Sequence, residues 1–346
     1  MFDPVDVALI GGAGFIGRAL LALLVETGRG VRIVSRRGAP PQLLGAGVRS
    51  FSADVADAEA VAAAIEGAAA VVYLATGGGD AWSDFERDFI SGAGHVAAAC
   101  LRHNVRRLVY TSSTAALYLG GRLAVDESVP ADPQAHRRSF YARAKREAEQ
   151  LLLDAHRRQG LPVVILRPGI VAGRGGILQH SGLGTWPSDL DCLGWGAGRH
   201  PLPFVLVDDV ARAMLAALDV AAIEGRSFNL AGDFRPSARQ FVAELAARSR
   251  RNFRFHPQSI GKLYAVELAK WLIKSLARKP DNPLPGWRDF QSRSLRAPID
   301  CSAARRLLGW RPNADADHFW REAIDPHLRP LADGDLRLPA PAGDAR

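Results

Sequence analysis

Short apolar runs and amphipathic segments follow one another in a regular order along the first 112 residues. Runs that are apolar at nearly every position are typical of strands buried on both faces of a sheet. They occur at Val5–Ile10, Val31–Ser35, Val48–Ala53, Ala69–Ala75 and Arg107–Thr111. Helical patterns lie between them, at about Phe15–Glu26, Ala56–Gly67 and Phe85–His103. This alternation predicts an α/β fold with a doubly wound parallel (Rossmann) sheet.

A glycine-rich turn joins the first predicted strand to the first predicted helix. Gly11, Gly14 and Gly17 form the pattern G-x-x-G-x-x-G. The first glycine permits a tight turn, the second leaves room for a pyrophosphate, and the third lets the helix pack closely. The helix N-terminus then presents free N–H groups to the phosphates. A surface turn is the alternative, but the position between strand and helix favours dinucleotide binding.

The second predicted strand ends in Ser35-Arg36-Arg37. In NAD-binding proteins a carboxylate at this position holds the ribose 2′-hydroxyl. Two guanidinium groups stand here instead, and Arg pairs with phosphate through a planar fork. The residues therefore predict NADP(H) in preference to NAD(H), with a surface arginine pair as the alternative.

Candidate catalytic groups follow the fifth predicted strand. Ser113 belongs to a run of hydroxyl residues at its end, and Tyr141 and Lys145 lie four residues apart on a predicted helix. Residues at this spacing share a helix face. A phenol has an ordinary pKa near 10, and a neighbouring ammonium lowers it toward the working range. The spacing alone also fits a buried tyrosine beside a lysine that reaches to the surface.

Together these motifs resemble the short-chain dehydrogenase/reductase superfamily. The resemblance is carried by GGAGFIG at 11–17, Asp54, TSS at 111–113, Tyr141 with Lys145, and Arg167-Pro168-Gly169. It extends over about residues 5–325. Within the superfamily the chain looks like the extended branch, which comprises NAD(P)-dependent epimerase/dehydratase and 3β-hydroxysteroid dehydrogenase-like proteins.

The resemblance implies a role for each matching residue. Tyr141 would be the catalytic acid–base, Lys145 would bind the nicotinamide ribose and tune Tyr141, and Ser113 would orient the reacting oxygen. Asp54 and Val55 would contact the adenine. The full expected cofactor-binding set is Gly11, Gly14, Phe15, Ile16, Gly17, Ser35, Arg36, Arg37, Asp54, Val55, Ala75, Thr76, Tyr141, Lys145, Pro168 and Gly169. No metal ligand is expected.

The chain departs from the family pattern at several positions, among them Ala172-Gly173-Arg174, which stands where YG is usual. The segment Phe89–Ala93 stands where relatives often carry N-V-x-G-T, and loss of the Asn puts bracing between helix and strand in doubt. Gly169 stands where sugar-nucleotide epimerases commonly have Asn. The departure at Gly169 weakens the interpretation as an enzyme of nucleotide sugars.

Composition and charge limit the partners. The net charge is +8, but only five of the 44 basic residues are lysines and the arginines are scattered, so we expect anionic small molecules and no nucleic acid as partners. Three widely spaced cysteines indicate a reducing compartment without disulfide or zinc site. No signal peptide or apolar run of about 18 residues is present, so a cytoplasmic location is expected.

We expect a discontinuous organisation. Residues 1–173 form an NADP-binding Rossmann domain with a return segment at about 203–231. Residues 174–330 form a smaller, partly helical C-terminal substrate domain, and 331–346 a disordered tail. In the segment 261–279, Lys270, Lys274 and Arg278 are assigned to a face opposite Val266, Ala269, Ile273 and Leu276. Such a helix can lie on an anionic membrane, but packing on the substrate domain is the favoured interpretation.

The predicted function is that of an NAD(P)-dependent oxidoreductase that transfers a hydride between NADP(H) and a carbonyl or alcohol substrate. One alternative is a nucleotide-sugar epimerase or dehydratase with a tightly held NAD(P). A second is a redox-inert NADP(H)-sensing protein. The resemblance further implies a homodimer, formed through the helices near 85–103 and 139–159.

Overall fold

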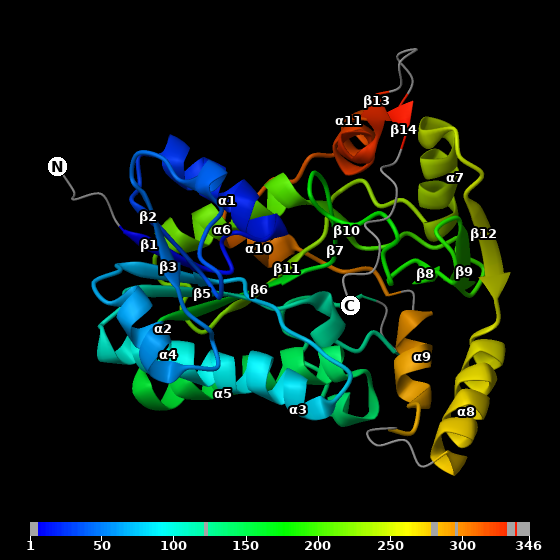
Figure 1. The fold of residues 1–346 in the computed structure, drawn as a ribbon, viewed down its shortest axis with the longest axis horizontal. Coiled ribbons are helices and arrows are strands. Elements are labelled where there is room, and N and C mark those ends of the chain that lie inside the picture. Colours follow the sequence, from blue (N-terminus) through cyan, green and yellow to red (C-terminus); the bar gives the residue numbers. More distant parts are fainter. Residues whose placement is uncertain (1–5, 121–123, 278–282, 295–296, 331–335, 338–346) are drawn as a thin grey trace.

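A seven-stranded parallel sheet forms the centre of the molecule (Figure 1). The computed structural model describes residues 6–120, 124–277, 283–294, 297–330 and 336–337. The sheet order is β11-β6-β5-β4-β1-β2-β3. Its strands are β1 Val7–Ile10, β2 Val31–Ser35, β3 Val48–Ser52, β4 Ala70–Tyr73, β5 Arg107–Thr111, β6 Val163–Pro168 and β11 Ser227–Leu230. The chain reverses direction across the sheet between β1 and β4, which confirms the doubly wound fold and opens a crevice at their carboxyl ends.

Helices cover both faces of this sheet because successive strand residues point to opposite sides. Val7 and Leu9 belong to the core beneath α1 (Phe15–Glu26) and α6 (Val207–Asp219). Ala8 and Ile10 belong to the opposite core. That second core is closed by α2 Ala58–Ile65, α4 Gly92–Arg102 and α5 Phe140–Gln159. Strands buried on both faces explain why their sequences are continuously apolar.

The helix expected over Phe85–His103 is interrupted. It consists of α3 (Trp82–Phe85), a π-helical segment η2 (Glu86–Ser91) and α4. In η2 the Tyr73 hydroxyl donates a hydrogen bond of 3.2 Å to the carbonyl of Asp88. This bond ties β4 to the helix at the place where the family Asn is missing, so a brace between strand and helix is present in a different form.

The C-terminal part contains smaller elements. Its strands are β7 Ile170–Ala172, β8 Gly184–Thr185, β9 Asp191–Trp195, β10 Phe204–Leu206, β12 Arg254–Gln258, β13 Arg329–Pro330 and β14 Leu336–Arg337. Its helices are α7 Ala238–Ser249, α8 Ile260–Leu276, α9 Trp287–Arg293, α10 Ser302–Leu307 and α11 Ala316–Ala323. Short 3₁₀ turns are η1 Pro41–Leu43, η3 Thr114–Ala116, η4 Ala135–Arg137 and η5 Asp325–His327. Phe204, stacked on Phe241 with centroids 4.9 Å apart, lies in a third core. The division at residue 173 stays a prediction.

Helix α8 corrects one expectation about packing. The face expected to pack on the substrate domain is exposed, by 44% at Val266, 68% at Ile273 and 84% at Leu276. The helix does contact α9, within the region 174–330 assigned to the substrate domain, but it does so through Tyr264, whose ring centroid lies 5.2 Å from that of Trp287. Lysine and apolar residues that were expected on opposite faces therefore both point outward.

Other expectations concern the ends of the chain and its cysteines. Arg278 and most of the predicted disordered tail, 331–346, lie outside the described residues. Leu336–Arg337 within that tail pairs antiparallel with Arg329–Pro330. All three cysteines are free and buried. Within the described ranges, no helix is long and apolar enough to cross a bilayer, and His, Cys, Asp and Glu side chains form no cluster suited to a metal.

Candidate active site

The glycine turn after β1 is shaped by close backbone contacts. Gly11 has a φ of +85°, and a Cβ placed on it would lie 2.7 Å from the amide nitrogen of Ala75. A Cβ on Gly17 would lie 2.5 Å from the carbonyl oxygen of Gly12. Gly14 caps the N-terminus of α1. The turn thus presents bare backbone and a helix N-terminus to the space above the sheet, as a diphosphate requires.

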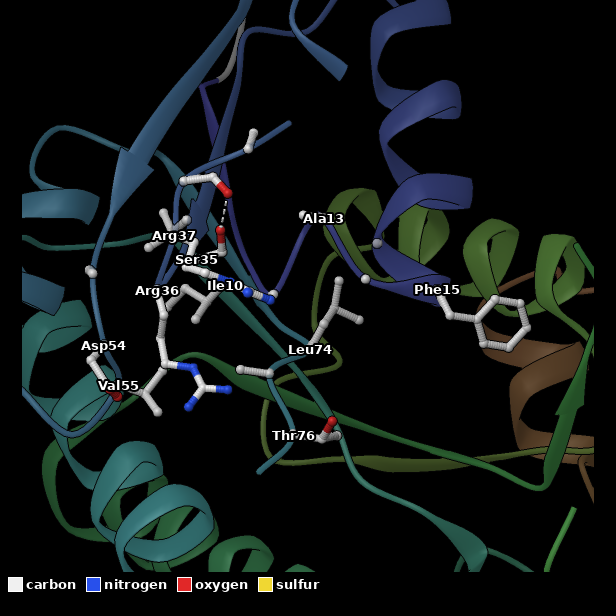
Figure 2. Close-up of a pocket in the computed structure, with 18 of the residues that line it drawn as sticks. Ile10, Ala13, Phe15, Ser35, Arg36, Arg37, Asp54, Val55, Leu74 and Thr76 are labelled. Carbon is white, nitrogen blue, oxygen red and sulfur yellow. Dashed lines mark hydrogen bonds between the residues drawn. The ribbon is translucent and has the colours of Figure 1, made fainter. Parts of the chain in front are cut away.

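That space is a cavity of about 890 Å³ at the carboxyl ends of β1, β2 and β4 (Figure 2). Most of the expected cofactor-binding residues line it, namely Gly11, Gly14, Phe15, Ile16, Gly17, Ser35, Arg36, Arg37, Asp54, Val55, Ala75 and Thr76. Tyr141, Lys145, Pro168 and Gly169 are not among the described lining residues. The cavity is large enough for the adenosine and diphosphate parts of a dinucleotide.

Three arginines border this cavity. Arg36 and Arg37 are exposed, and Figure 2 shows the Arg36 guanidinium reaching into the cavity near Val55. No carboxylate of the described residues pairs with either side chain. Arg18, in the first turn of α1, also lines the cavity and donates from Nε to the carbonyl of Ala13 at 2.8 Å. Sequence reasoning missed Arg18, although its position beside Gly17 was a usable signal.

Ser113 and Tyr141 come together at the end of β5 and the start of α5. Burial raises the pKa of the Tyr141 phenol, and a hydrogen bond with Ser113 acts in the opposite direction. The Tyr141 ring lies edge-on to Phe89 with centroids 5.9 Å apart, and the residue as a whole is 38% exposed. The phenol is therefore held beside Ser113, while part of the residue remains exposed.

Lys145 lies one turn further along α5 and is 1% exposed. Its Nζ donates to the carbonyl of Thr111 at 2.8 Å and lies 5.9 Å from the centre of the Tyr141 ring. Burial lowers the pKa of Lys145 to about 7, while the charge of Glu149 acts the other way. The amine can therefore gain or lose a proton near neutral pH.

The π-helical segment η2 connects the cavity to this group. Asp88 lines the cavity, and the next residue, Phe89, packs on Tyr141. Lys145 Nζ lies 5.0 Å from the Phe89 ring centre. Sequence reasoning missed both η2 residues, because the pattern of apolar positions does not distinguish a π-helical turn from an α-helical one.

Pro168 and Gly169 were expected to lie beside the nicotinamide. The structure shows that Gly169 is also required by the packing of the chain. A Cβ on Gly169 would lie 1.9 Å from the carbonyl oxygen of Pro203, so the crossing of these backbones requires glycine. The preceding residue, Arg167, forms a buried ion pair with Glu149 at 2.7 Å. These contacts join β6 to the helix that carries Lys145.

Helix α9, almost 150 residues later in the chain, holds the start of α5. Asp289 accepts a hydrogen bond of 3.0 Å from the backbone N–H of Ser139, the N-cap of α5. Arg138 donates to the carbonyls of Ala115 and Leu117, just beyond Ser113. The segments that carry Ser113 and Tyr141 are thus tied to each other and to α9.

Replacing Asp289 by Ala tests this connection. We expect the free energy of unfolding to fall by about 1–3 kcal/mol, because the Ser139 N–H loses its acceptor. We also expect kcat to fall more than the affinity for NADPH, since Tyr141 loses its fixed position. Chemical denaturation and steady-state kinetics measure the two effects. Asp317→Ala, at an exposed position of α11, is the matched control, and an unchanged kcat in Asp289→Ala would contradict a positioning role.

The fold and the cavity define a dinucleotide-binding α/β enzyme. The model of the NAD dependent epimerase/dehydratase family matches residues 7–231. The chain belongs to this family, whose members bind NAD(P). This confirms the resemblance inferred from the motifs.

Relatives of known activity include reductases and dehydrogenases. A 2-alkyl-3-oxoalkanoate reductase of Stenotrophomonas maltophilia is 30% identical over 70% of this chain and 74% of its own length. A 3β-hydroxysteroid-dehydrogenase/decarboxylase of Arabidopsis thaliana is 31% identical over 60% of this chain, which spans only 51% of that protein. Among solved structures, MoeE5 in complex with UDP-glucuronic acid and NAD has a TM-score of 0.70 at 21% identity, covering 93% of this chain and 98% of that one. The similarity to MoeE5 shows a shared fold and nothing more.

Proposed function

We propose that the chain is an NADP(H)-dependent carbonyl reductase, with Tyr141 as the acid–base. The observation that carries the proposal is the grouping of Tyr141 with the Ser113 hydroxyl and the buried Lys145 amine, which η2 joins to a cavity large enough for the adenosine and diphosphate parts of a dinucleotide. The bare backbone at Gly11 and the arginines at the cavity edge fit a dinucleotide diphosphate and an additional phosphate. When bound, NADPH supplies the hydride.

Each of the three residues has a separate task in this proposal. The Ser113 hydroxyl holds the substrate carbonyl oxygen by a hydrogen bond. As the carbonyl carbon accepts the hydride, the Tyr141 hydroxyl gives its proton to the same oxygen, and the alcohol forms. Protonated Lys145 stabilises the phenolate that remains until solvent returns the proton. Burial raises the pKa of the Tyr141 phenol. The positive charge of Lys145 is needed to offset this rise, so that Tyr141 can give up and regain its proton near neutral pH.

The cavity arginines support NADP(H) over NAD(H). In the variant Arg36→Ala/Arg37→Ala, we expect the dissociation constant for NADPH to rise roughly 10- to 100-fold, because charge-assisted hydrogen bonds to the 2′-phosphate contribute about 1.5–3 kcal/mol. Affinity for NADH should stay as it was. Calorimetric titration of both cofactors measures this, with Arg321→Ala on α11 as the control. Equal losses for NADH and NADPH would contradict the assignment.

A second, apolar pocket supports a substrate with an apolar part. It has a volume of about 250 Å³ and is lined by Leu193, Trp195, Leu263, Val266 and Phe290, with Lys270 and Arg293 also in its wall. Phe290 is next to Asp289, which binds Ser139, so this pocket adjoins the helix start that carries Tyr141. Its cationic side chains are paired within the protein, Lys270 with Glu267 at 2.7 Å and Arg293 with Asp289 at 3.0 Å, so the pocket supports the apolar part of the substrate only. We propose 3-oxo acids with alkyl substituents as substrates, as in the name of the Stenotrophomonas reductase.

The test is a cofactor-consumption assay. The enzyme is supplied with NADPH or NADH and with a panel of alkyl 3-oxo acids, cyclic ketones and nucleotide sugars. Steady oxidation of NADPH by an oxo acid supports the proposal. Conversion of a nucleotide sugar without net oxidation indicates an epimerase or dehydratase, and NADPH binding without turnover of any compound indicates a sensor.

A further inference from the structure

The outward face of α8 carries apolar residues and lysines together. Its large side chains that are more than half exposed are Leu272 (51%), Ile273 (68%) and Leu276 (84%). At about 100° per residue these side chains lie within one half of the helix circumference, and Lys262 and Lys274 lie in or beside the same half. We name these five residues the α8 stripe. Both lysines are exposed.

The opposite face of α8 fixes the helix in this orientation. The Tyr264 ring lies 5.2 Å from that of Trp287 and 5.5 Å from that of Phe290, both on α9. No residue of α8 is buried. Figure 1 shows α8 at the outer edge of the molecule, with its C-terminal end near the beginning of α9. Leu284, just before α9, is 61% exposed and adds to the apolar surface at that end.

We propose that the α8 stripe binds the surface of an anionic lipid bilayer, with the helix lying along the interface. Aliphatic side chains then enter the boundary between headgroups and acyl chains. The lysine stems lie along that boundary and place their ammonium groups among the lipid phosphates. Burial of the exposed aliphatic side chains and attraction to anionic headgroups act on the same face.

The charges on α8 favour an anionic lipid surface over a second copy of the chain. Glu267 is the only acidic residue in α8, and it is paired with Lys270 at 2.7 Å. A second copy of the chain seated on the stripe by two-fold symmetry would bring lysines close to lysines, which is unfavourable. An anionic lipid surface faces the same lysines with opposite charge.

Vesicle co-sedimentation tests the proposal with the full chain. The probes are vesicles of phosphatidylcholine alone and vesicles with about 30 mol % phosphatidylglycerol, enough to give a negative surface potential. We expect binding to the anionic vesicles only, and weaker binding as the salt concentration rises.

Two variants separate the apolar and the cationic contributions. Ile273→Glu/Leu276→Glu should abolish binding, because two charges would have to enter the interface. Lys262→Gln/Lys274→Gln should weaken it by roughly fivefold for each lysine, or about 25-fold together. The matched controls are Val25→Glu on α1 and Arg158→Gln on α5, which should bind as the unchanged chain does. Thermal unfolding and NADPH affinity show that each variant is folded.

Three results would overturn the proposal. The first is no binding to anionic vesicles, or equal binding to neutral ones. The second is vesicle binding that both α8 variants retain, which would locate the contact elsewhere. The third is a self-associated chain that becomes monomeric in Ile273→Glu/Leu276→Glu and never binds vesicles, which would make the stripe an interface between copies.

Discussion

Replacing Tyr141 by Phe is expected to lower kcat by about 10²- to 10⁴-fold, the usual contribution of a positioned acid–base. The ring packs edge-on against Phe89 without using its hydroxyl, so the variant should remain folded. The affinity for NADPH should be unchanged, since the cavity that the arginines border does not include Tyr141 among its described lining residues. Stopped-flow NADPH oxidation and calorimetric titration measure the two quantities.

A matched control separates the phenol at position 141 from phenols in general. Tyr264→Phe removes a hydroxyl from α8 and leaves the ring contacts with Trp287 and Phe290 of α9 in place, so this variant should keep its activity. If Tyr141→Phe retained full kcat with every substrate that is turned over, Tyr141 would not be the acid–base. Absence of turnover by the unchanged chain with every compound of the panel would be a separate result, and it would favour the interpretation as a redox-inert sensor.

Replacing Lys145 by Met is expected to remove most of kcat and to change how stability depends on pH. Burial holds the pKa of Lys145 near 7 in the folded chain, against an ordinary 10.5. Between these two values the unfolded chain binds more protons than the folded chain. Stability therefore rises with pH across this interval on account of Lys145, by about 5 kcal/mol at most. Below the lower value both states are protonated, and the cost of burying the charge is fully present.

The difference between the two proteins isolates this effect. Urea denaturation of the unchanged chain and of Lys145→Met is compared across the interval from about 7 to 10.5. The advantage of Met over Lys should shrink as pH rises. Lys262→Met, at an exposed position of α8, is the control and should show no such trend. A difference that is constant with pH would mean that Lys145 keeps its ordinary pKa, as the nearby rings of Phe89 and Tyr110 would favour.

The parallel sheet could be predicted because its strands are buried on both faces and therefore continuously apolar. The ranges Phe15–Glu26, Val31–Ser35 and Arg107–Thr111 were found at the expected residues. The break at Glu86–Ser91 could not be predicted, since apolar periodicity is nearly the same in α- and π-helical turns. The orientation of α8 was wrong for another reason. An apolar stripe shows that a face avoids water, but it does not show whether protein covers that face.

The candidate site also contains residues that could be predicted from the sequence and residues that could not. Residues whose role depends on local chain geometry, such as Gly11 and the Arg36-Arg37 pair, could be found from their place after a strand. Residues that act through distant contacts could not. Asp289 meets Ser139 across 150 positions of sequence, and no local pattern marks that contact. Asp88 reaches the cavity only because η2 turns it there.

A crystal structure with NADP⁺ bound tests the central claim most directly. The proposal predicts the 2′-phosphate beside Arg36 and Arg37, and Lys145 Nζ about 2.7–3.2 Å from an oxygen of the nicotinamide ribose. The nicotinamide ring would face the Tyr141 hydroxyl. Electron density with the nicotinamide remote from Tyr141, or with the 2′-phosphate away from both arginines, would contradict the account.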